Sequence, residues 1–365
     1  MSRTRTLLAA LALVTLASCG GKKQGFDYTV NVNLNDQFIN QPVYLVDMAT
    51  GKAFDSVIAN AATVEFKGTL QEPIICRLAT SSNYSIFILE EGNIYVDPII
   101  DSLSGTPSND AIYKAAFSPE IRKATNDFQA VYQQYQNGDS DTRTRLTPIL
   151  DSLYAIPQML TEKAYAELYK DNKDNILGAY AFTNLCQSYT SASQMEKALE
   201  GATDLIRNYP PVNNHLVMLR NIDNTAPGKH FIDIPGIDFS TGKESSLAAM
   251  IEGKVALVDF WASWCGPCKA EIKENLVRIH EKYASQGLVV VGVDVFERKA
   301  EDHAKAVEAL GIKYPQLIDS QNKAGDLYGF NSIPQIILIG ADGNIIARDL
   351  RGNAIEAAVK EALQK

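Results

Sequence analysis

The most constraining feature of the sequence is an apolar segment that runs almost directly into two closely spaced cysteines. Residues 255–260 read Val-Ala-Leu-Val-Asp-Phe, and Cys265-Gly266-Pro267-Cys268 begins five residues after this run ends. Such a run is typical of a strand covered on both faces. A helix that starts at the cysteines would offer its unpaired N–H groups and about half a positive charge to an anion. We therefore expect Cys265 to be an attacking thiolate and Cys268, one turn further, to be a more buried resolving thiol.

The segments around this motif alternate between strand and helix patterns after a linker at Thr225-Ala226-Pro227-Gly228. The Asp342-Gly343 pair between two apolar runs predicts a hairpin. The sequence favours, in order, strand 255–260, a helix with Ile272, Leu276, Ile279 and Tyr283 on one face, strand 288–295, helix 300–310, strands 335–339 and 344–347, and helix 354–363. This order predicts an α/β domain over residues 225–365, with a mixed sheet flanked by helices.

The N-terminus has the pattern of a secretory signal. Arg3 and Arg5 precede the run 7–16, which is apolar apart from Thr15 and too short to span a bilayer stably. Leu16-Ala17-Ser18-Cys19 resembles the lipobox of bacterial lipoproteins, which implies a signal peptide over 1–18, lipidation of Cys19 and a tether over 19–25. An ordinary cleaved signal with an incidental cysteine is the alternative.

A lipidated chain would be anchored to a membrane without crossing it. Gly20 and Gly21 follow Cys19, without an acidic cluster. By the lipoprotein resemblance, this pattern suggests the periplasmic face of the outer membrane, within the cell envelope.

Residues 26–108 alternate apolar and polar side chains in short runs divided by turn residues, which predicts a small antiparallel β-sandwich-like domain. Its segments 87–94 and 105–109 resemble a domain of unknown function that often precedes a thioredoxin-like domain in bacterial lipoproteins. Residues 109–224 change to helical periods, with breaks near 137–139, 171–173 and 209–211, and predict an all-helical region of four or five helices. Its tyrosines are expected to lie mainly in the core.

Composition excludes one class of partner. The 365 residues suggest two or three domains. A net charge of −9 does not provide the attraction to phosphates that dominates nucleic-acid binding, so we expect no nucleic-acid partner.

The remaining cysteines and the histidines give no metal site. Cys76 and Cys186 are each expected to be small buried hydrophobes, although an oxidising compartment would permit a disulfide between them. A C-x-x-C is half of a zinc site, but there is no second pair. The histidines lie in separate segments without ligand spacing: His215, His230, His280 and His303. We therefore predict no metal, and no cofactor other than a Cys265–Cys268 redox disulfide.

The stretch Asp259-Phe-Trp-Ala-Ser-Trp-Cys-Gly-Pro-Cys268 resembles thioredoxin, and more closely the TlpA/ResA-like membrane-attached thiol-disulfide oxidoreductases. The resemblance covers residues 225–365. It implies that Asp259 is a buried proton acceptor for Cys268, with a pKa raised by desolvation. Glu271 falls at the position of an active-site glutamate in these relatives, with a solvated helix residue as the alternative.

The same resemblance implies a substrate-binding surface around the motif. Its residues are Trp264, Gly266, Pro267, Ile333 and Pro334, with Ile333-Pro334 matching the family's cis-proline loop. An ordinary trans proline at the start of an edge strand is the alternative. Two positions depart from the family: Lys273 replaces a helix-kinking proline, and Gln335 replaces the threonine that commonly follows the cis-proline.

These features together predict a lipid-anchored, cell-envelope reductase of protein disulfides. Its substrates would include proteins with cysteines awaiting haem attachment in cytochrome c maturation. Because the sequence has no nucleotide-binding signature, a membrane thiol donor would return the protein to its reduced form. A peroxiredoxin-type peroxidase is an alternative, although Ala262 stands where that family needs Thr or Ser. A non-enzymatic binding lipoprotein is the third reading.

Overall fold

The computed structural model describes residues 25–81, 84–319 and 323–364, so the predicted signal segment and Cys19 lie outside the described residues. The chain divides into two compact units, one ending at Lys114 and the other beginning at Ala115. This division falls within helix α1 (Pro107–Ala116). Among the described residues, no helix is both long and apolar enough to cross a membrane.

The N-terminal unit is built from two four-stranded sheets, with orders β4-β1-β7-β8 and β3-β2-β5-β6. All strand pairs in both sheets are antiparallel except β1 with β7, which is parallel. The strands are β1 (Phe26–Asn33), β2 (Pro42–Asp47), β3 (Ala53–Ile58), β4 (Thr63–Leu70), β5 (Ile74–Ala79), β6 (Tyr84–Leu89), β7 (Gly92–Asp97) and β8 (Ser102–Ser104), with a 3-10 turn η1 (Asp36–Phe38). The predicted β-rich class is confirmed, but the parallel pair was not expected.

The middle of the chain is helical, as predicted, with more helices than expected. They are α2 (Pro119–Asn137), α3 (Ser140–Lys170), α4 (Ile176–Leu185), η2 (Cys186–Ser188), α5 (Ala192–Ala198), α6 (Asp204–Arg207) and α7 (Pro210–Asn224). The short α5 and α6 explain the difference, because an apolar period cannot be recognised over one or two turns.

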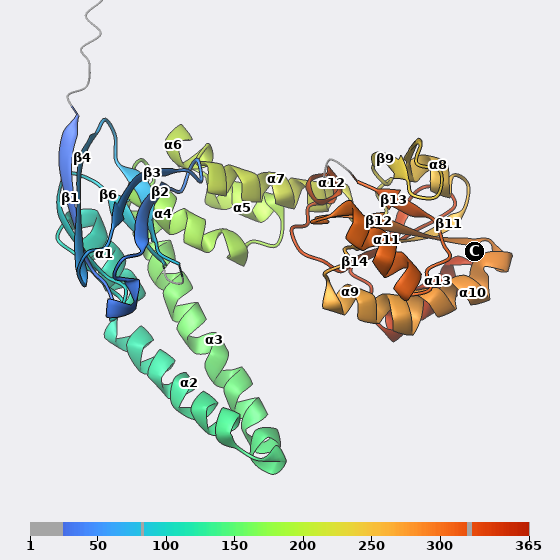
Figure 1. The fold of residues 1–365 in the computed structure, drawn as a ribbon, viewed down its shortest axis with the longest axis horizontal. Helices are drawn as coiled ribbons and strands as arrows, with labels where there is room; N and C mark the ends of the chain where they lie inside the picture. The colour runs from blue at the N-terminus through green and yellow to red at the C-terminus, as the bar shows by residue number, and fades with distance from the viewer. Residues whose placement is uncertain (1–24, 82–83, 320–322, 365) are drawn as a thin grey trace, which may run out of the picture. The chain divides into compact units, whose positions relative to one another are not determined.

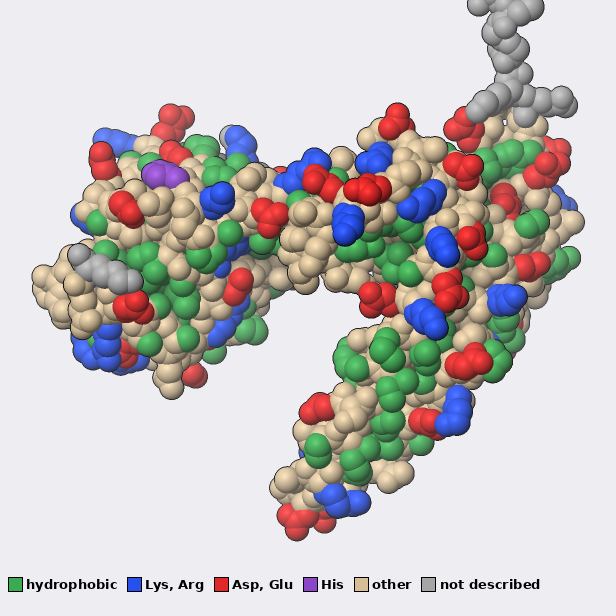
Figure 2. Space-filling view, turned by 180° about the vertical axis from the view of Figure 1, so that it is seen from behind, with side chains coloured by type: hydrophobic (Ala, Val, Ile, Leu, Met, Phe, Trp, Pro, Cys, Tyr) green, Lys and Arg blue, Asp and Glu red, His purple; other side chains and the backbone are tan. Residues whose placement is uncertain are grey.

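Helices α2 and α3 lie side by side as an antiparallel hairpin (Figure 1). Hydrophobic side chains run along its surface (Figure 2). They include Tyr132, Ile149, Tyr154, Ile156 and Met159, each more than one-third exposed. Tyr165 and Tyr169, near the C-terminal end of α3, and Tyr180 in α4 are buried. The expectation that the tyrosines lie in the core therefore holds for these three and is wrong for Tyr132 and Tyr154.

The C-terminal region contains a seven-stranded mixed sheet of order β10-β9-β13-β12-β11-β14-β15. Its strands are β9 (Pro235–Asp238), β10 (Glu244–Ser246), β11 (Val255–Trp261), β12 (Leu288–Asp294), β13 (Gln316–Ile318), β14 (Gln335–Ile339) and β15 (Ile345–Ala347). β11, β12 and β13 are parallel, whereas β14 is antiparallel to β11. β14 and β15 form the predicted hairpin across Asp342-Gly343. The predicted α/β fold with a mixed sheet is confirmed.

Helices cover both faces of this sheet. They are α8 (Leu247–Ile251), α9 (Gly266–Glu271), η3 (Ile272–Leu276), α10 (Val277–Tyr283), η4 (Ala284–Gln286), α11 (Ala300–Ala309), α12 (Lys323–Tyr328) and α13 (Asn353–Ala362). Leu257 and Val290 of the sheet pack with residues of η3, α10 and α13. Val258 and Val291 face the other way and pack with residues of α8 and α12. Because β11 is buried on both faces, its continuous apolar sequence is explained.

Helix α7 of the helical region packs against α12 of the sheet domain. Gly329 follows α12 with a φ of +70°, and a Cβ built on it would lie 2.5 Å from the carbonyl oxygen of Met218 in α7. An l-residue at this position would have both a disfavoured backbone angle and a collision.

We expect Gly329→Ala to destabilise the protein more than Gly253→Ala does. Gly253 has a similar φ of +67° with no atom within 4 Å of a built Cβ, so it controls for backbone strain alone. Overpacking of this kind costs about 1–3 kcal/mol, and we expect the Gly329 variant to melt at least about 3 °C lower than the control. Equal midpoints in thermal unfolding followed by circular dichroism would contradict the close approach.

Candidate active site

Cys265 and Cys268 are joined as a disulfide at the start of a helix. The Cα atoms of the two residues are 5.3 Å apart. Cys265 is the N-cap of α9, and its Sγ accepts the backbone N–H of Cys268 at 3.2 Å. β11 ends at Trp261, so the strand delivers the pair to the carboxyl edge of the parallel strands. This is the edge at which open α/β sheets generally bind ligands.

The helix that begins at Cys265 continues without interruption from α9 through η3 to Tyr283. Lys273 lies within η3, which is π-helical, and the N–H of Val277 donates to the carbonyl of Ile272. Lys273 stands where the TlpA/ResA-like proteins usually have a helix-kinking proline. In this chain the wider π-helical turn at that position interrupts the regular α-helix instead. Turns of this type are frequent at functional sites.

Asp259 lies in β11 and is completely buried. Neither carboxylate oxygen has a hydrogen-bond partner among the described residues. Burial raises the pKa of this carboxyl well above its usual value; the positive charge of Arg351 acts against the shift, and the negative charge of Glu271 adds to it. A buried carboxyl without hydrogen-bond partners lowers the stability of the fold, and a pKa so strongly raised by burial marks the group as a candidate for a functional role.

Glu271, at the end of α9, is partly buried and is held from two directions. Its Oε1 and Oε2 accept the backbone N–H of Gly352 at 3.1 and 3.2 Å. Its Oε2 also accepts the Asn275 side-chain amide at 2.8 Å. The structure therefore does not show a freely solvated helix residue at this position; Glu271 instead joins the helix to the segment that precedes α13.

Arg351 was not identified from the sequence, yet it connects several parts of the site. Its guanidinium donates to the carbonyl oxygens of Pro334 and Leu350. Its charge also acts on Asp259. The Ile333–Pro334 peptide bond is cis, and both residues are partly buried. The only sequence signal for Arg351 is a basic residue just before the closing helix, which is too common to single it out.

The residues flanking the cysteines are accessible. Gly266 and Pro267 are exposed, and no atom lies within 4 Å of a Cβ built on Gly266. Trp264 is 42% exposed and donates through Nε1 to the carbonyl of Phe296 at 2.9 Å. The guanidinium of Arg298 lies over its ring, 5.0 Å from the centroid. Cys265 itself, between Trp264 and Gly266, is 4% exposed.

The two remaining cysteines in the described residues are free thiols. Cys76 and Cys186 are both buried. Burial raises the pKa of each thiol to about 12, which leaves both thiols protonated at neutral pH. They match the expectation of small buried hydrophobes and take no part in a redox pair.

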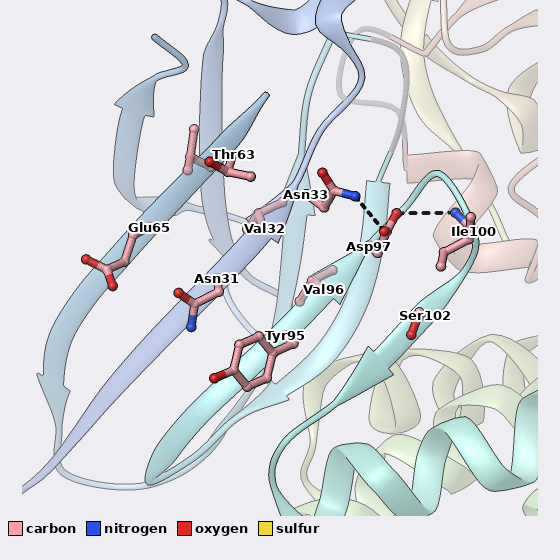
Figure 3. Close-up of a pocket in the computed structure, with 11 residues that line it drawn as sticks. Asn31, Val32, Asn33, Thr63, Glu65, Tyr95, Val96, Asp97, Ile100 and Ser102 are labelled. Atoms are coloured by element: carbon pink, nitrogen blue, oxygen red, sulfur yellow. Dashed lines mark hydrogen bonds between the residues drawn. The ribbon is translucent and has the colours of Figure 1, made fainter. Parts of the chain in front are cut away.

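A concave region, separate from the cysteine pair, lies on the sheet of the N-terminal unit that contains β1, β4 and β7 (Figure 3). Strands β1, β4 and β7 contribute to this groove, which has a volume of about 600 Å³. Asn33 donates to Asp97 at 2.7 Å, and Tyr95 is 53% exposed. The lining offers amide, carboxylate and hydroxyl groups and includes no cysteine, so this groove is separate from the thiol chemistry of the Cys265–Cys268 pair.

The fold and the site define a class of protein. A cysteine pair opens the helix between β11 and β12, and a β14–β15 hairpin followed by α13 completes the sheet. This is a thioredoxin-like domain carrying a dithiol–disulfide centre. Residues 227–348 match the model of the AhpC/TSA family.

Individual proteins whose sequences are similar to this chain are named thiol-disulfide oxidoreductases. The chain is 28% identical over 110 residues to the thiol-disulfide oxidoreductase ResA of Bacillus subtilis, covering 30% of this chain and 60% of that protein. It is 30% identical over 93 residues to ResA of Geobacillus kaustophilus, covering 26% and 52%. The chain thus spans less than two-thirds of the length of these relatives.

Among solved structures, one similar protein is the thioredoxin domain of a thiol-disulfide oxidoreductase from Bacteroides vulgatus. It is 31% identical, with 37% of this chain and 96% of that chain covered and a TM-score of 0.35. A thiol:disulfide interchange protein from Bacteroides sp. is 29% identical, with 39% and 93% covered and a TM-score of 0.36.

The buried Asp259 predicts a specific pH dependence of stability. An aspartate in an unfolded chain ionises near pH 3.9. Because burial raises the pKa of Asp259 in the folded protein, the folded protein retains a proton that the unfolded chain has lost above that pH. The stability contributed by this group therefore falls as pH rises.

We expect the stability of oxidised Asp259→Asn relative to the wild type to rise between about pH 4 and pH 8, by about 1.4 kcal/mol for each pH unit over which folded wild type keeps the proton that its unfolded chain has lost. Denaturant unfolding of both proteins at the two pH values measures the difference. A constant difference at both values would show that Asp259 does not ionise as its burial implies.

Proposed function

We propose that this protein is a cell-envelope thiol-disulfide oxidoreductase that reduces disulfides of other proteins. The Cys265–Cys268 disulfide at the start of a helix, beside an exposed surface, is the observation that carries the proposal. The sequence similarity to proteins named thiol-disulfide oxidoreductases supports the same chemistry.

The reaction would proceed through a mixed disulfide. The reduced Cys265 thiolate attacks one sulfur of the substrate disulfide, and the other substrate sulfur leaves as a thiolate. The Cys268 thiolate then attacks the Cys265 sulfur, which releases the second substrate thiol and leaves the Cys265–Cys268 disulfide. The substrate gains two electrons and two protons, and the protein loses them.

The local geometry supports different roles for the two cysteines. Cys265 borders the exposed Gly266 and Pro267, whereas Cys268 is fully buried one turn into the helix. The backbone N–H of Cys268 already points at the Cys265 sulfur, and the same N–H would stabilise a thiolate there. Cys265 is 4% exposed and Cys268 is fully buried, so we assign the first attack to Cys265, at the edge of the exposed surface, and the resolving attack to Cys268.

Asp259 is proposed as the group that takes the proton from Cys268 before resolution. Its desolvated carboxyl has a raised pKa, with the charges of Arg351 and Glu271 acting on it in opposite directions. Because burial raises its pKa, the Asp259 carboxylate binds a proton more strongly than an exposed aspartate does, which suits a group that accepts the proton of Cys268. Arg351, which also holds the Pro334 carbonyl, acts as a positioning residue that links this base to the proline loop.

The substrate surface is proposed to comprise Trp264, Gly266, Pro267, Ile333 and Pro334. Trp264 is fixed by its hydrogen bond to Phe296, so it offers a rigid aromatic ring next to Cys265. Lipidation of Cys19, an outer-membrane location facing the periplasm, a membrane thiol donor and substrates that await haem attachment are proposed from the sequence pattern. Nothing in the chemistry of the pair requires a further cofactor.

The peroxidase alternative makes a different demand on the site. It needs a hydroxyl three residues before the attacking cysteine, and position 262 holds a buried alanine. The position therefore offers no side-chain hydrogen bond to a bound peroxide.

We expect the reduced wild-type protein to reduce insulin disulfides in the presence of dithiothreitol, measured by turbidity. Cys265→Ser should lose this activity to the dithiothreitol background, because the attacking sulfur is absent. Cys76→Ser should retain it, since that thiol is buried and protonated. Rapid hydrogen peroxide consumption without insulin reduction would favour the peroxidase instead.

The Cys268→Ser variant allows a second test of the proposed exchange with proteins. Without the resolving thiol, Cys265 should remain bound to substrate proteins in a cell-envelope extract as adducts that dithiothreitol releases. Non-reducing electrophoresis detects them. Their absence would exclude a role in exchange with proteins, even if small disulfides were still reduced.

A further inference from the structure

A cluster of buried polar side chains lies close to the cysteine pair and takes no part in thiol exchange. Asp294 ends β12, His303 lies in α11, and Glu297 lies in the segment between them. Asp294 is 3% exposed and His303 is 1% exposed, while Glu297 is partly buried. Groups of this kind are rarely buried unless they are paired or bind a ligand.

The three side chains converge. One ligand atom from each lies within 4.8 Å of the other two. The Nδ1 of His303 is 3.3 Å from Oδ2 of Asp294. Nδ1 of His303 therefore already faces a carboxylate oxygen, whereas, among the described residues, Nε2 of His303 and Oδ1 of Asp294 are buried without a hydrogen-bond partner. Since most buried polar atoms have a partner, these atoms lack one that a bound group would supply.

The charge around the cluster favours a cation. Asp319 follows β13, and its backbone N–H donates to the carbonyl of Asp294 at 3.2 Å. Its Oδ1 is also buried without a partner, although its Oδ2 accepts the Ala324 N–H at 2.7 Å. The negative charges of Glu297 and Asp319 both act on Asp294, and His303 is the one basic side chain of the cluster. A divalent ion would neutralise this excess of negative charge, which is otherwise expensive to bury.

We propose that Asp294, Glu297 and His303 form a binding site for one divalent transition-metal ion, of which Zn²⁺ is the representative. Two carboxylate oxygens and one imidazole nitrogen are ligands that zinc accepts, with water completing the coordination. Magnesium prefers an all-oxygen site and is the weaker occupant here.

The ion would fix the segment that supports the cysteine motif. Glu297 accepts the backbone N–H of Ser263 at 2.8 Å and its hydroxyl at 3.0 Å. The neighbouring Phe296 carbonyl accepts Nε1 of Trp264. Through Glu297, the ion would tie the end of β12 and helix α11 to the residues immediately before Cys265. This role is structural and goes beyond the proposed exchange reaction.

The test is calorimetric titration of Zn²⁺ into the oxidised full chain, in which Cys265 and Cys268 cannot bind the metal as thiols. We expect one ion per chain and much weaker heat with Mg²⁺. Glu297→Gln and His303→Gln should each weaken Zn²⁺ binding at least about tenfold, the lower end of losses for even an outer-shell partner of a metal. Glu301→Gln, an exposed acid in the same helix α11, is the matched control and should bind as the wild type does.

Thermal unfolding without metal shows whether each variant folds, and Zn²⁺ should raise the midpoint of the wild type and the control only. If His303→Gln does not fold, the partly exposed Glu297 variant decides the outcome. Absence of Zn²⁺ binding by the oxidised wild type, or equal binding by the ligand variants and the control, would overturn the proposal. Insulin reduction in metal-free buffer is measured separately, so failure of either proposal leaves the other open to its own test.

Discussion

The active site depends on where the central strand places one sulfur atom. β11 is buried on both faces and ends at Trp261, and four residues later Cys265 caps a helix that extends to Tyr283. The Cys265 sulfur consequently accepts one of the free N–H groups in the first turn of this helix, that of Cys268, at 3.2 Å. The same strand carries Asp259 into the interior. One buried strand thus supplies both the position of the nucleophile and the desolvated acid proposed to serve its partner.

The remaining parts of the site come from distant segments held by hydrogen bonds. Arg351 joins the Pro334 carbonyl to the segment before α13, and Gly352 joins that segment to Glu271 on the cysteine helix. On another side, Glu297 and Phe296 hold Ser263 and Trp264. The short loop between β11 and α9 is therefore supported by groups from two other connections of the sheet. Such support positions a reacting group without requiring it to be rigid on its own.

The sequence was sufficient for the parts of the structure that have a strong local pattern. The apolar run 255–260 predicted β11, and Asp342-Gly343 predicted the β14–β15 hairpin, because both signals lie within a few residues. The apolar–polar alternation over residues 26–108 did not single out β3, because most of its side chains are exposed. The parallel pairing of β1 with β7 was missed because register between distant strands leaves no local trace.

Local patterns also decided which residues of the active site could be identified from the sequence. Cys265 and Cys268 could be recognised from the sequence because the C-x-x-C spacing directly after an apolar strand is itself typical of a redox-active cysteine pair. The contacts of Arg351 could not, since its partners are set by the tertiary fold. The cluster of Asp294, Glu297 and His303 illustrates the same limit: His303 has no ligand spacing with another histidine, and only the packing of α11 beside the end of β12 brings the three groups together. The spacing of histidines and cysteines in the sequence therefore gave no sign of a metal site there.

The most direct test of the account is the pH dependence of alkylation of Cys265 in the reduced protein. Iodoacetamide reacts with the thiolate, and mass spectrometry of the Cys268→Ser variant assigns the modification to Cys265. We expect the rate of Cys265 alkylation to reach half its maximum well below about pH 8.5, the pH at which a free cysteine ionises. The reason is that the helix N-terminus stabilises the Cys265 thiolate. A half-maximal rate at or above that pH would contradict it.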